Sequence, residues 1–202
     1  MTIPMLLDFA GIALFSATGA LSASRKQLDI VGFMFLGTIT GIGGGTLRDL
    51  ILDVPVFWVQ QPYYILICAL AAVVVYFTAH KLESRYRLLL WLDALALGAY
   101  GVFGAYKGLA VSDAPIVAVV MGMLTGTAGG ILRDVVAGEP SVIMRREIYI
   151  TAVIAGTAVF VLLDHLGLPV PVSTVTGAVI VFGIRAGAIA RGWTLPQYMP
   201  RK

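Results

Sequence analysis

Seven long apolar stretches are the feature of this sequence that most restricts its fold. They lie near residues 4–23, 29–52, 62–80, 88–108, 114–137, 146–166 and 170–190. Each is long enough to cross a hydrocarbon core about 30 Å thick as an α-helix. Hydrophobic residues make up 59% of the chain and charged residues only 12%, proportions far from those of a soluble domain. We therefore predict an all-α integral membrane protein, with residues 1–202 forming a single membrane domain.

The first stretch is predicted to be a transmembrane helix rather than a signal peptide, because it lacks a basic leading segment and contains Asp8. The distribution of Lys and Arg over the loops predicts the orientation of the spans. By the positive-inside rule the more basic side is cytoplasmic, which places the N-terminus outside and, with seven spans, the C-terminus in the cytoplasm. The basic side carries Arg25, Lys26, Lys81, Arg85, Arg87, Arg145, Arg146, Arg191, Arg201 and Lys202, whereas Lys107 is the clearest basic loop residue of the other side.

Several other functions find little support in the residues. The net charge is +3, but the basic residues form neither one patch nor a long run, so no nucleic acid is expected as a partner. Cys68 is the single cysteine and lies within the third stretch, where we expect it to pack. His80 and His165 fall near the ends of stretches and suit hydration better than metal binding. No metal, cofactor or catalytic residue is predicted, and the chain is not expected to be an enzyme.

A nine-residue motif occurs twice, as GIGGGTLRD at residues 41–49 and GTAGGILRD at residues 126–134. The offset of 85 residues between Asp49 and Asp134 extends without a gap over most of the chain. We therefore predict a duplication, with repeat one near 4–82, repeat two near 89–167, and a seventh helix near 170–190. Because each repeat holds three spans, the second copy is inverted relative to the first. Further pairs at this offset are Asp8 with Asp93, Gly19 with Gly104, Gly37 with Gly122, Pro55 with Pro140, Tyr64 with Tyr149, and His80 with His165.

The glycines of the motif are predicted to kink the second and fifth helices. A glycine-rich stretch of helix bends or unwinds easily, and this exposes carbonyl oxygens that replace part of the hydration shell of a cation. Thr40 and Thr125 add a hydroxyl immediately before each motif. The pattern does not match a dinucleotide-binding turn or a phosphate-binding loop. The predicted kink residues are Gly41, Gly43, Gly44, Gly45, Gly126, Gly129 and Gly130.

Each motif ends in an Arg-Asp pair, Arg48 with Asp49 and Arg133 with Asp134. Adjacent residues diverge by about 100° on a helix, so pairing across the repeats is an alternative to pairing within each motif. One interpretation is a set of salt bridges that only locks the two halves together. We favour the other, in which the arginines form a gate, or an anchor for an anion or a lipid, and the aspartates attract cations.

Three more charged residues are candidates for a pore mouth. Asp8 and Asp93 fall near the starts of the first and fourth stretches, on opposite sides of the membrane. Helix N-terminal acids, favoured by the macrodipole, are an equally good interpretation of both. Lys107 is predicted to lie in an outer loop, either near the path of ions or simply solvated. Arg185 lies within the last stretch and must snorkel or pair.

The repeat, the seven spans, the orientation and the two glycine motifs together resemble the prokaryotic trimeric intracellular cation (TRIC) channels. The resemblance covers nearly the whole chain. It implies a homotrimer with a pore within each protomer, conducting potassium and other monovalent cations, in a prokaryotic plasma (inner) membrane with lipids as further partners. Animal members carry a Lys-Glu-Val motif that engages a phosphoinositide. The corresponding positions here are Gly129, Gly130 and Ile131, which argues against such regulation, although Arg133 resembles the arginine that follows that motif.

The function predicted from the sequence is therefore a potassium-permeable cation channel. The alternative is a secondary transporter for glycine or another small amino acid, because bacterial relatives of similar sequence have been discussed as such carriers. Half-helix ends would then bind the carboxylate of the substrate, and Asp49 or Asp134 its amine.

Overall fold

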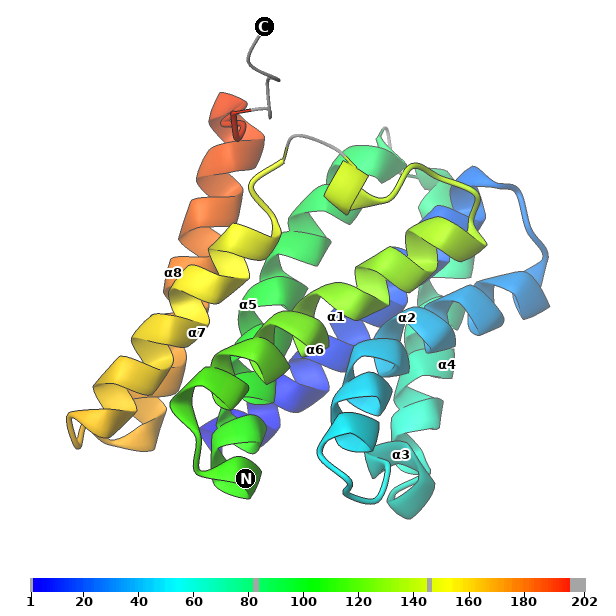
Figure 1. Ribbon diagram of the computed structural model, residues 1–202. Helices are drawn as coiled ribbons and strands as arrows, with labels where there is room; N and C mark the ends of the chain where they lie inside the picture. The colour runs from blue at the N-terminus through cyan, green and yellow to red at the C-terminus, as the bar shows by residue number, and fades with distance from the viewer. Residues whose placement is uncertain (1, 82–83, 145–146, 197–202) are drawn as a thin grey trace, which may run out of the picture.

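Helices account for almost all of the described chain, which in this computed structural model comprises residues 2–81, 84–144 and 147–196. Short helices α3 (Phe57–Gln60), η1 (Ala79–Lys81) and η2 (Val142–Met144) lie between longer ones (Figure 1). The predicted all-α membrane fold with seven spans is confirmed. The long helices are α1 (Ile3–Arg25), α2 (Ile30–Ile51), α4 (Tyr63–Thr78), α5 (Arg85–Ser112), α6 (Pro115–Val136), α7 (Ile150–His165) and α8 (Val170–Arg191).

The helix boundaries differ from the predicted ones in two places. Helix α5 begins at Arg85 because the Ser84 side chain caps it by accepting the Arg87 N–H, and it continues to Ser112. Helix α7 is shorter than predicted, with 16 residues, whereas six other helical segments meet the usual length for a membrane span. The basic residues Arg145, Arg146, Arg201 and Lys202 lie outside the described residues.

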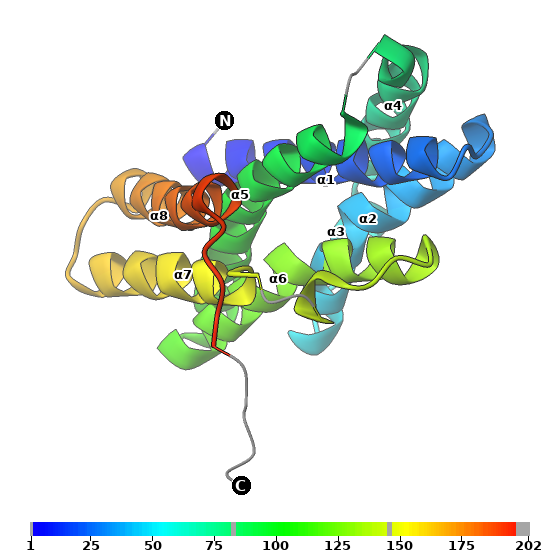
Figure 2. The same cartoon turned by 90° about the horizontal axis from the view of Figure 1, so that it is seen from above.

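Two units of three helices pack in the same way. In the first unit α1 packs against both α2 and α4, and in the second α5 packs in the same manner against α6 and α7. Helices α1 and α5 also pack against each other at the centre of the molecule (Figure 1). Helix α8 lies beside α7 at the edge of the bundle remote from α4 and also contacts α5 (Figure 2).

Helices α2 and α6 cross each other at their glycine motifs. A Cβ atom placed on Gly44 would collide with the carbonyl group of Thr125, and one on Gly129 would collide with that of Thr40. These four residues are equivalent in pairs at the offset of 85. The glycines therefore permit a close crossing between the two units, as small residues do in membrane helix pairs.

Both crossing helices bend but stay helical through their motifs (Figures 1 and 2). The Thr40 hydroxyl donates to the Leu36 carbonyl at 2.5 Å, and the Thr125 hydroxyl donates to the Met121 carbonyl at 2.6 Å. Such back-bonding to the preceding turn often bends a helix. The glycine stretches thus bend without unwinding. Their carbonyl oxygens are therefore not exposed in the way that unwinding would expose them.

Candidate functional site

Two clusters of buried charge lie toward opposite ends of the crossing helices. Arg48 is in the last turn of α2, and Arg133 is in the last turn of α6. Because the two helices belong to inverted units, these last turns lie at opposite ends of the bundle. The charges therefore flank the glycine crossing on both sides.

The first cluster, called the Asp49 cluster, consists of Asp8, Arg48, Asp49, Tyr64 and Lys107. The Asp49 Oδ1 atom accepts from Arg48 Nε at 2.7 Å and from Lys107 Nζ at 2.8 Å. Nearby, the Tyr64 hydroxyl donates to Asp8 Oδ2 at 2.5 Å. The Arg48 guanidinium also stands over an aromatic ring of the other unit. Its Cζ atom is 5.2 Å from the centroid of Phe103.

The second cluster, called the Asp134 cluster, consists of Thr18, Asp93, Arg133, Asp134 and Tyr149. The Arg133 Nε atom donates to Asp134 Oδ1 at 3.0 Å. Its Nη1 atom donates to Asp93 Oδ1 at 2.8 Å and to the Thr18 hydroxyl at 3.0 Å. Arg133 thus ties α6 to α5 and to α1 of the other unit. The guanidinium is 2% exposed, and all of its nitrogen atoms have acceptors.

Each cluster contains one contact to a backbone N–H, and the two contacts are equivalent at the offset of 85. Asp49 Oδ2 accepts the N–H of Phe57, and Asp134 Oδ2 accepts the N–H of Val142, both at 3.0 Å. Each aspartate therefore anchors the chain eight residues further on, at the start of a short helix. In the first unit this contact forms α3, an element that the sequence did not suggest.

The adjacent Arg-Asp residues pair with each other in both units. Of the two alternatives that the sequence left open, the structure has the pairing within each motif, because the arginine side chain is long enough to turn back toward its neighbour. Both oxygens of Asp49 and of Asp134 accept hydrogen bonds from protein groups. They are therefore not free carboxylates, which differs from the role of attracting cations that the sequence suggested.

The candidates for a pore mouth also lie in different surroundings from those expected. Lys107 is a helical residue of α5 that pairs with Asp49 across the two units, not a loop lysine. Asp8 and Asp93 are 4% and 1% exposed, so neither is a solvated charge at an open entrance. Asp93 pairs with Arg133, whereas Asp8 keeps its Oδ1 atom without a hydrogen-bond partner among the described residues.

The formal charges of the clusters differ by one. Two carboxylates and two cations balance in the Asp49 cluster. The Asp134 cluster holds two carboxylates and one guanidinium, because Ser22 occupies the position equivalent to Lys107. A small cavity of about 10 Å³ is lined by Arg133 and Asp134. Its other lining residues are Ser22, Arg25, Tyr86, Leu89, Leu90, Glu139 and Val142.

An ion pair that a buried arginine of α8 forms was not predicted from the sequence. Arg185 is 1% exposed and donates to a carboxylate oxygen of Glu147 and to the Ile148 carbonyl. The sequence indicated that Arg185 must pair or snorkel, but it did not identify Glu147, which lies just before α7, as the partner. The pair fixes α8 to the beginning of α7.

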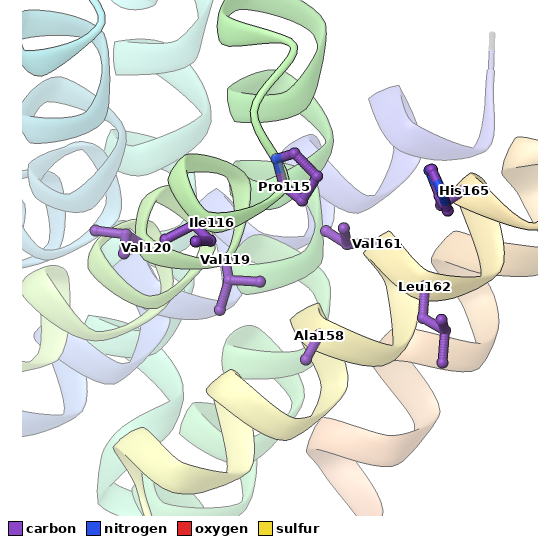
Figure 3. Close-up of a pocket in the computed structure, with 8 residues that line it drawn as sticks. All are labelled: Pro115, Ile116, Val119, Val120, Ala158, Val161, Leu162 and His165. Carbon is purple, nitrogen blue, oxygen red and sulfur yellow. The ribbon is translucent and has the colours of Figure 1, made fainter.

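A separate groove on the outside of α6 and α7 is almost entirely apolar (Figure 3). Its volume is about 450 Å³, and the His165 side chain supplies the polar group at one end. None of its lining residues belongs to either charge cluster, so it is not part of a polar path. The part of the chain that the structure describes also holds no group of three His, Cys, Asp or Glu side chains placed to bind a metal.

Taken together, the fold and the clusters define a helical membrane protein of two inverted units with buried charges between them. A family model described as glycine transporter matches residues 5–80 and 90–165. A TRIC channel orthologue from Rhodobacter sphaeroides is 49% identical in sequence, covers 96% of this chain and 100% of its own, and superposes with a TM-score of 0.93. The chain therefore belongs to this family, whose solved prokaryotic members are described as TRIC channels.

Two further relatives agree with this membership. A prokaryotic TRIC channel in 0.5 M KCl is 26% identical, with a TM-score of 0.88 and coverage of 96% of this chain and 98% of its own. The inner membrane protein YadS of Escherichia coli is 37% identical over 198 residues, which is 95% of this chain and 94% of YadS. The predicted resemblance is thus confirmed. Membership in a channel family also agrees with the prediction that the chain is not an enzyme.

Proposed function

We propose that this protein is a channel for monovalent cations, including potassium, with a pore between the two inverted units of each subunit of a homotrimer. The observation that carries the proposal is the pair of buried charge clusters flanking the α2–α6 crossing. Charges buried in membrane helices are costly and usually line a route for ions. The TRIC description of the solved relatives supports the same function and the trimer.

The pore would pass the Asp49 cluster, the crossing and the Asp134 cluster in turn. The net negative formal charge of the Asp134 cluster favours cations over anions at that end. Arg48 and Arg133 would act as the gate, because a guanidinium in the path repels a cation until it moves aside. We place the N-terminus outside and the protein in the inner membrane of a prokaryote, as YadS is described for Escherichia coli.

A carrier for glycine or another small amino acid is the second candidate, favoured by the description of the matching family model. A zwitterion needs a free anion site and a free cation site close together. The carboxylates expected to bind its amine, Asp49 and Asp134, have their oxygens occupied by protein donors. Because these oxygens already accept hydrogen bonds from the protein, we favour the channel over the carrier.

Planar-bilayer recording of the purified protein in asymmetric KCl tests the proposal, together with counterflow uptake of labelled glycine by the same protein in liposomes. Discrete unitary currents that reverse near the potassium equilibrium potential, without glycine counterflow, are expected. Bilayers without currents, together with saturable glycine counterflow, would mean that the protein is a carrier and not a channel.

A further inference from the structure

The apolar groove on the outside of α6 and α7 lies where α6 begins and α7 ends. Its lining side chains lie between Pro115 and Val120 on α6 and between Ala158 and His165 on α7 (Figure 3). Seven helical residues rise about 10 Å, so the groove fits within one leaflet of a membrane. Its volume of about 450 Å³ is that of a ligand pocket. An empty groove of this size would forfeit van der Waals contacts, so an apolar group should fill it.

The first unit fills the equivalent place with aromatic rings. Between α2 and α4 the rings of Phe33 and Tyr76 pack edge to face with their centroids 5.0 Å apart, and the Tyr76 ring also contacts that of Phe77. Smaller aliphatic residues occupy the equivalent positions of the second unit, namely Ala118, Val161 and Leu162. The groove therefore results from smaller side chains in the second unit and not from the repeated packing of the fold.

The end of the groove meets a second hollow that carries two carboxylates. This hollow has a volume of about 360 Å³ and shares Pro115, Val161 and His165 with the groove. It adds the side chains of Asp113 and Asp164. Neither carboxylate has a hydrogen bond or an ion pair within the part of the chain that the structure describes. The equivalent positions of the first unit hold apolar residues, Leu28 and Ala79.

The beginning of α6 differs from that of α2 at the same place. In the first unit the Asp29 side chain caps α2 by accepting the Gly32 N–H at 2.8 Å. Ala114 occupies the equivalent position of the second unit, so α6 begins without a side-chain cap. The first N–H groups of a helix then favour an anion such as a phosphate. The second unit thus combines a groove, two carboxylates and an uncapped helix start, and each of the three departs from the repeat.

We propose that the groove and the adjoining hollow bind one phospholipid whose head group carries a primary amine. One acyl chain lies in the groove, the phosphate lies at the beginning of α6, and the amine lies beside Asp113 and Asp164. Both charges of the zwitterionic head group thus meet complementary groups of the protein. The site lies outside the two charge clusters, and the inference does not depend on the proposed channel function.

The head group must supply the selectivity of this site, because the tails of the surrounding lipids are as apolar as the groove. A choline head group lacks the N–H donors that a carboxylate accepts. An anionic head group without an amine would place its charge near two carboxylates. The amine-bearing phospholipid is therefore the lipid that the site should prefer.

Native mass spectrometry of the detergent-solubilised protein tests this preference. The probes are phosphatidylethanolamine, phosphatidylcholine and phosphatidylglycerol with identical acyl chains. The ethanolamine lipid should bind with an apparent Kd roughly threefold to tenfold lower than the other two, because charge pairs at a partly exposed site contribute modestly. Equal affinities for the three lipids would overturn the proposal.

Removal of the two carboxylates tests where the amine binds. The double variant Asp113→Asn with Asp164→Asn should reduce the preference for the ethanolamine lipid over the choline lipid to less than about twofold. Asp53→Asn is the matched control, because Asp53 is an exposed acid that shares the left-handed backbone conformation of Asp113 and lies outside both hollows. It should keep the full preference. A double variant with the preference of the wild type would contradict the proposed amine site.

Filling the groove tests where the acyl chain lies. Val120→Phe with Leu162→Phe introduces the residues that the first unit has at these positions, Phe35 and Phe77, and should weaken binding of the ethanolamine lipid by roughly threefold or more. Leu66→Phe, on the exposed face of α4, is the control and should bind like the wild type. Unchanged lipid binding in the filled variant would overturn the proposal. If that variant also lost subunits in the same spectra, a second copy of this chain would be the occupant of the groove instead.

Discussion

Single residues carry most of the difference between the two halves of this molecule, and Arg48 and Arg133 illustrate it. Both belong to a glycine motif and pair with its last residue, an aspartate, yet Arg133 also bonds Asp93 and Thr18. A guanidinium can bond several acceptors at once through its fork, which the single ammonium of lysine cannot reproduce. The two arginines should therefore differ in how much they stabilise the fold.

Arg133→Lys is expected to lower the stability of the detergent-solubilised protein by about 1–3 kcal/mol, because it loses at least one bond to a buried charge. Arg48→Lys serves as the matched control and should cost less, since among the described residues Arg48 makes one such bond, and Lys107 already shares its aspartate. Thermal unfolding followed by intrinsic fluorescence measures both. Equal losses in the two variants would mean that the extra contacts of Arg133 contribute nothing.

The sequence located the charged residues of the site but not their partners. The duplicated motif singled out Arg48, Asp49, Arg133 and Asp134, and the structure places them in two separate clusters of buried charge. Their pairing depends on side-chain torsions and on the depth at which α1 and α5 pass, which no residue pattern encodes. Tyr64 and Tyr149 were noticed only as a repeated pair, since a tyrosine near a helix end is ordinary in membrane proteins.

At the level of helices, the crossing of α2 and α6 is the contact that joins the two units at their glycine motifs. The sequence predicted bent helices from the glycines, and the structure adds that these glycines face a carbonyl of the opposite motif. Gly44 lies against Thr125, and Gly129 lies against Thr40. Local composition predicts where a helix tolerates close approach, but the partner follows only from the inverted arrangement of the repeats.

Gly44→Ala should separate these helices, because its methyl group would collide with backbone that cannot rotate away. Overpacking of this kind typically costs about 1–3 kcal/mol. Gly183→Ala, on the exposed side of α8 with no atom within 4 Å of the added carbon, is the matched control. It should be neutral or slightly stabilising, because alanine favours a helix more than glycine does.

Thermal unfolding and bilayer recording of both alanine variants check this contact. Gly44→Ala should unfold at lower temperature and conduct less, while Gly183→Ala should match the wild type in both. If Gly44→Ala were as stable as Gly183→Ala, the helices would not be in close contact at this point.

For the whole molecule, the seven apolar stretches predicted the number of spans, and the gapless offset of 85 residues predicted their arrangement as two repeats and a seventh helix. Each unit repeats one packing pattern, and α8 was correctly separated from both. The short α3 and the Arg185–Glu147 pair were not predictable. Helix α3 begins at a backbone group held by the side chain of Asp49, and the ion pair joins residues that are 38 positions apart in the chain. The fold itself does not fix the orientation in the membrane. That orientation was predicted from the distribution of Lys and Arg over the loops.

The described basic residues outside the clusters, including Lys81 at the end of η1, lie at the end of the bundle where α1 finishes and α5 begins, whereas Ser112 lies at the other end. The positive-inside rule therefore predicts that Ser112 faces outward and Lys81 faces the cytoplasm. Both are exposed, and the buried Cys68 is the single cysteine to remove. Ser112→Cys and Lys81→Cys, each in a Cys68→Ala background, thus report one side each.

An impermeant maleimide applied to intact cells should label Ser112→Cys, and Lys81→Cys should react only after the membrane is permeabilised. The reverse pattern would place the N-terminus and the Asp49 cluster in the cytoplasm and exchange the positions of the two gates. Labelling of both cysteines in intact cells would mean that the chain inserts in both orientations. In that case the two inverted units would each face both compartments, and the difference in charge between the Asp49 and Asp134 clusters could not give the channel a fixed direction.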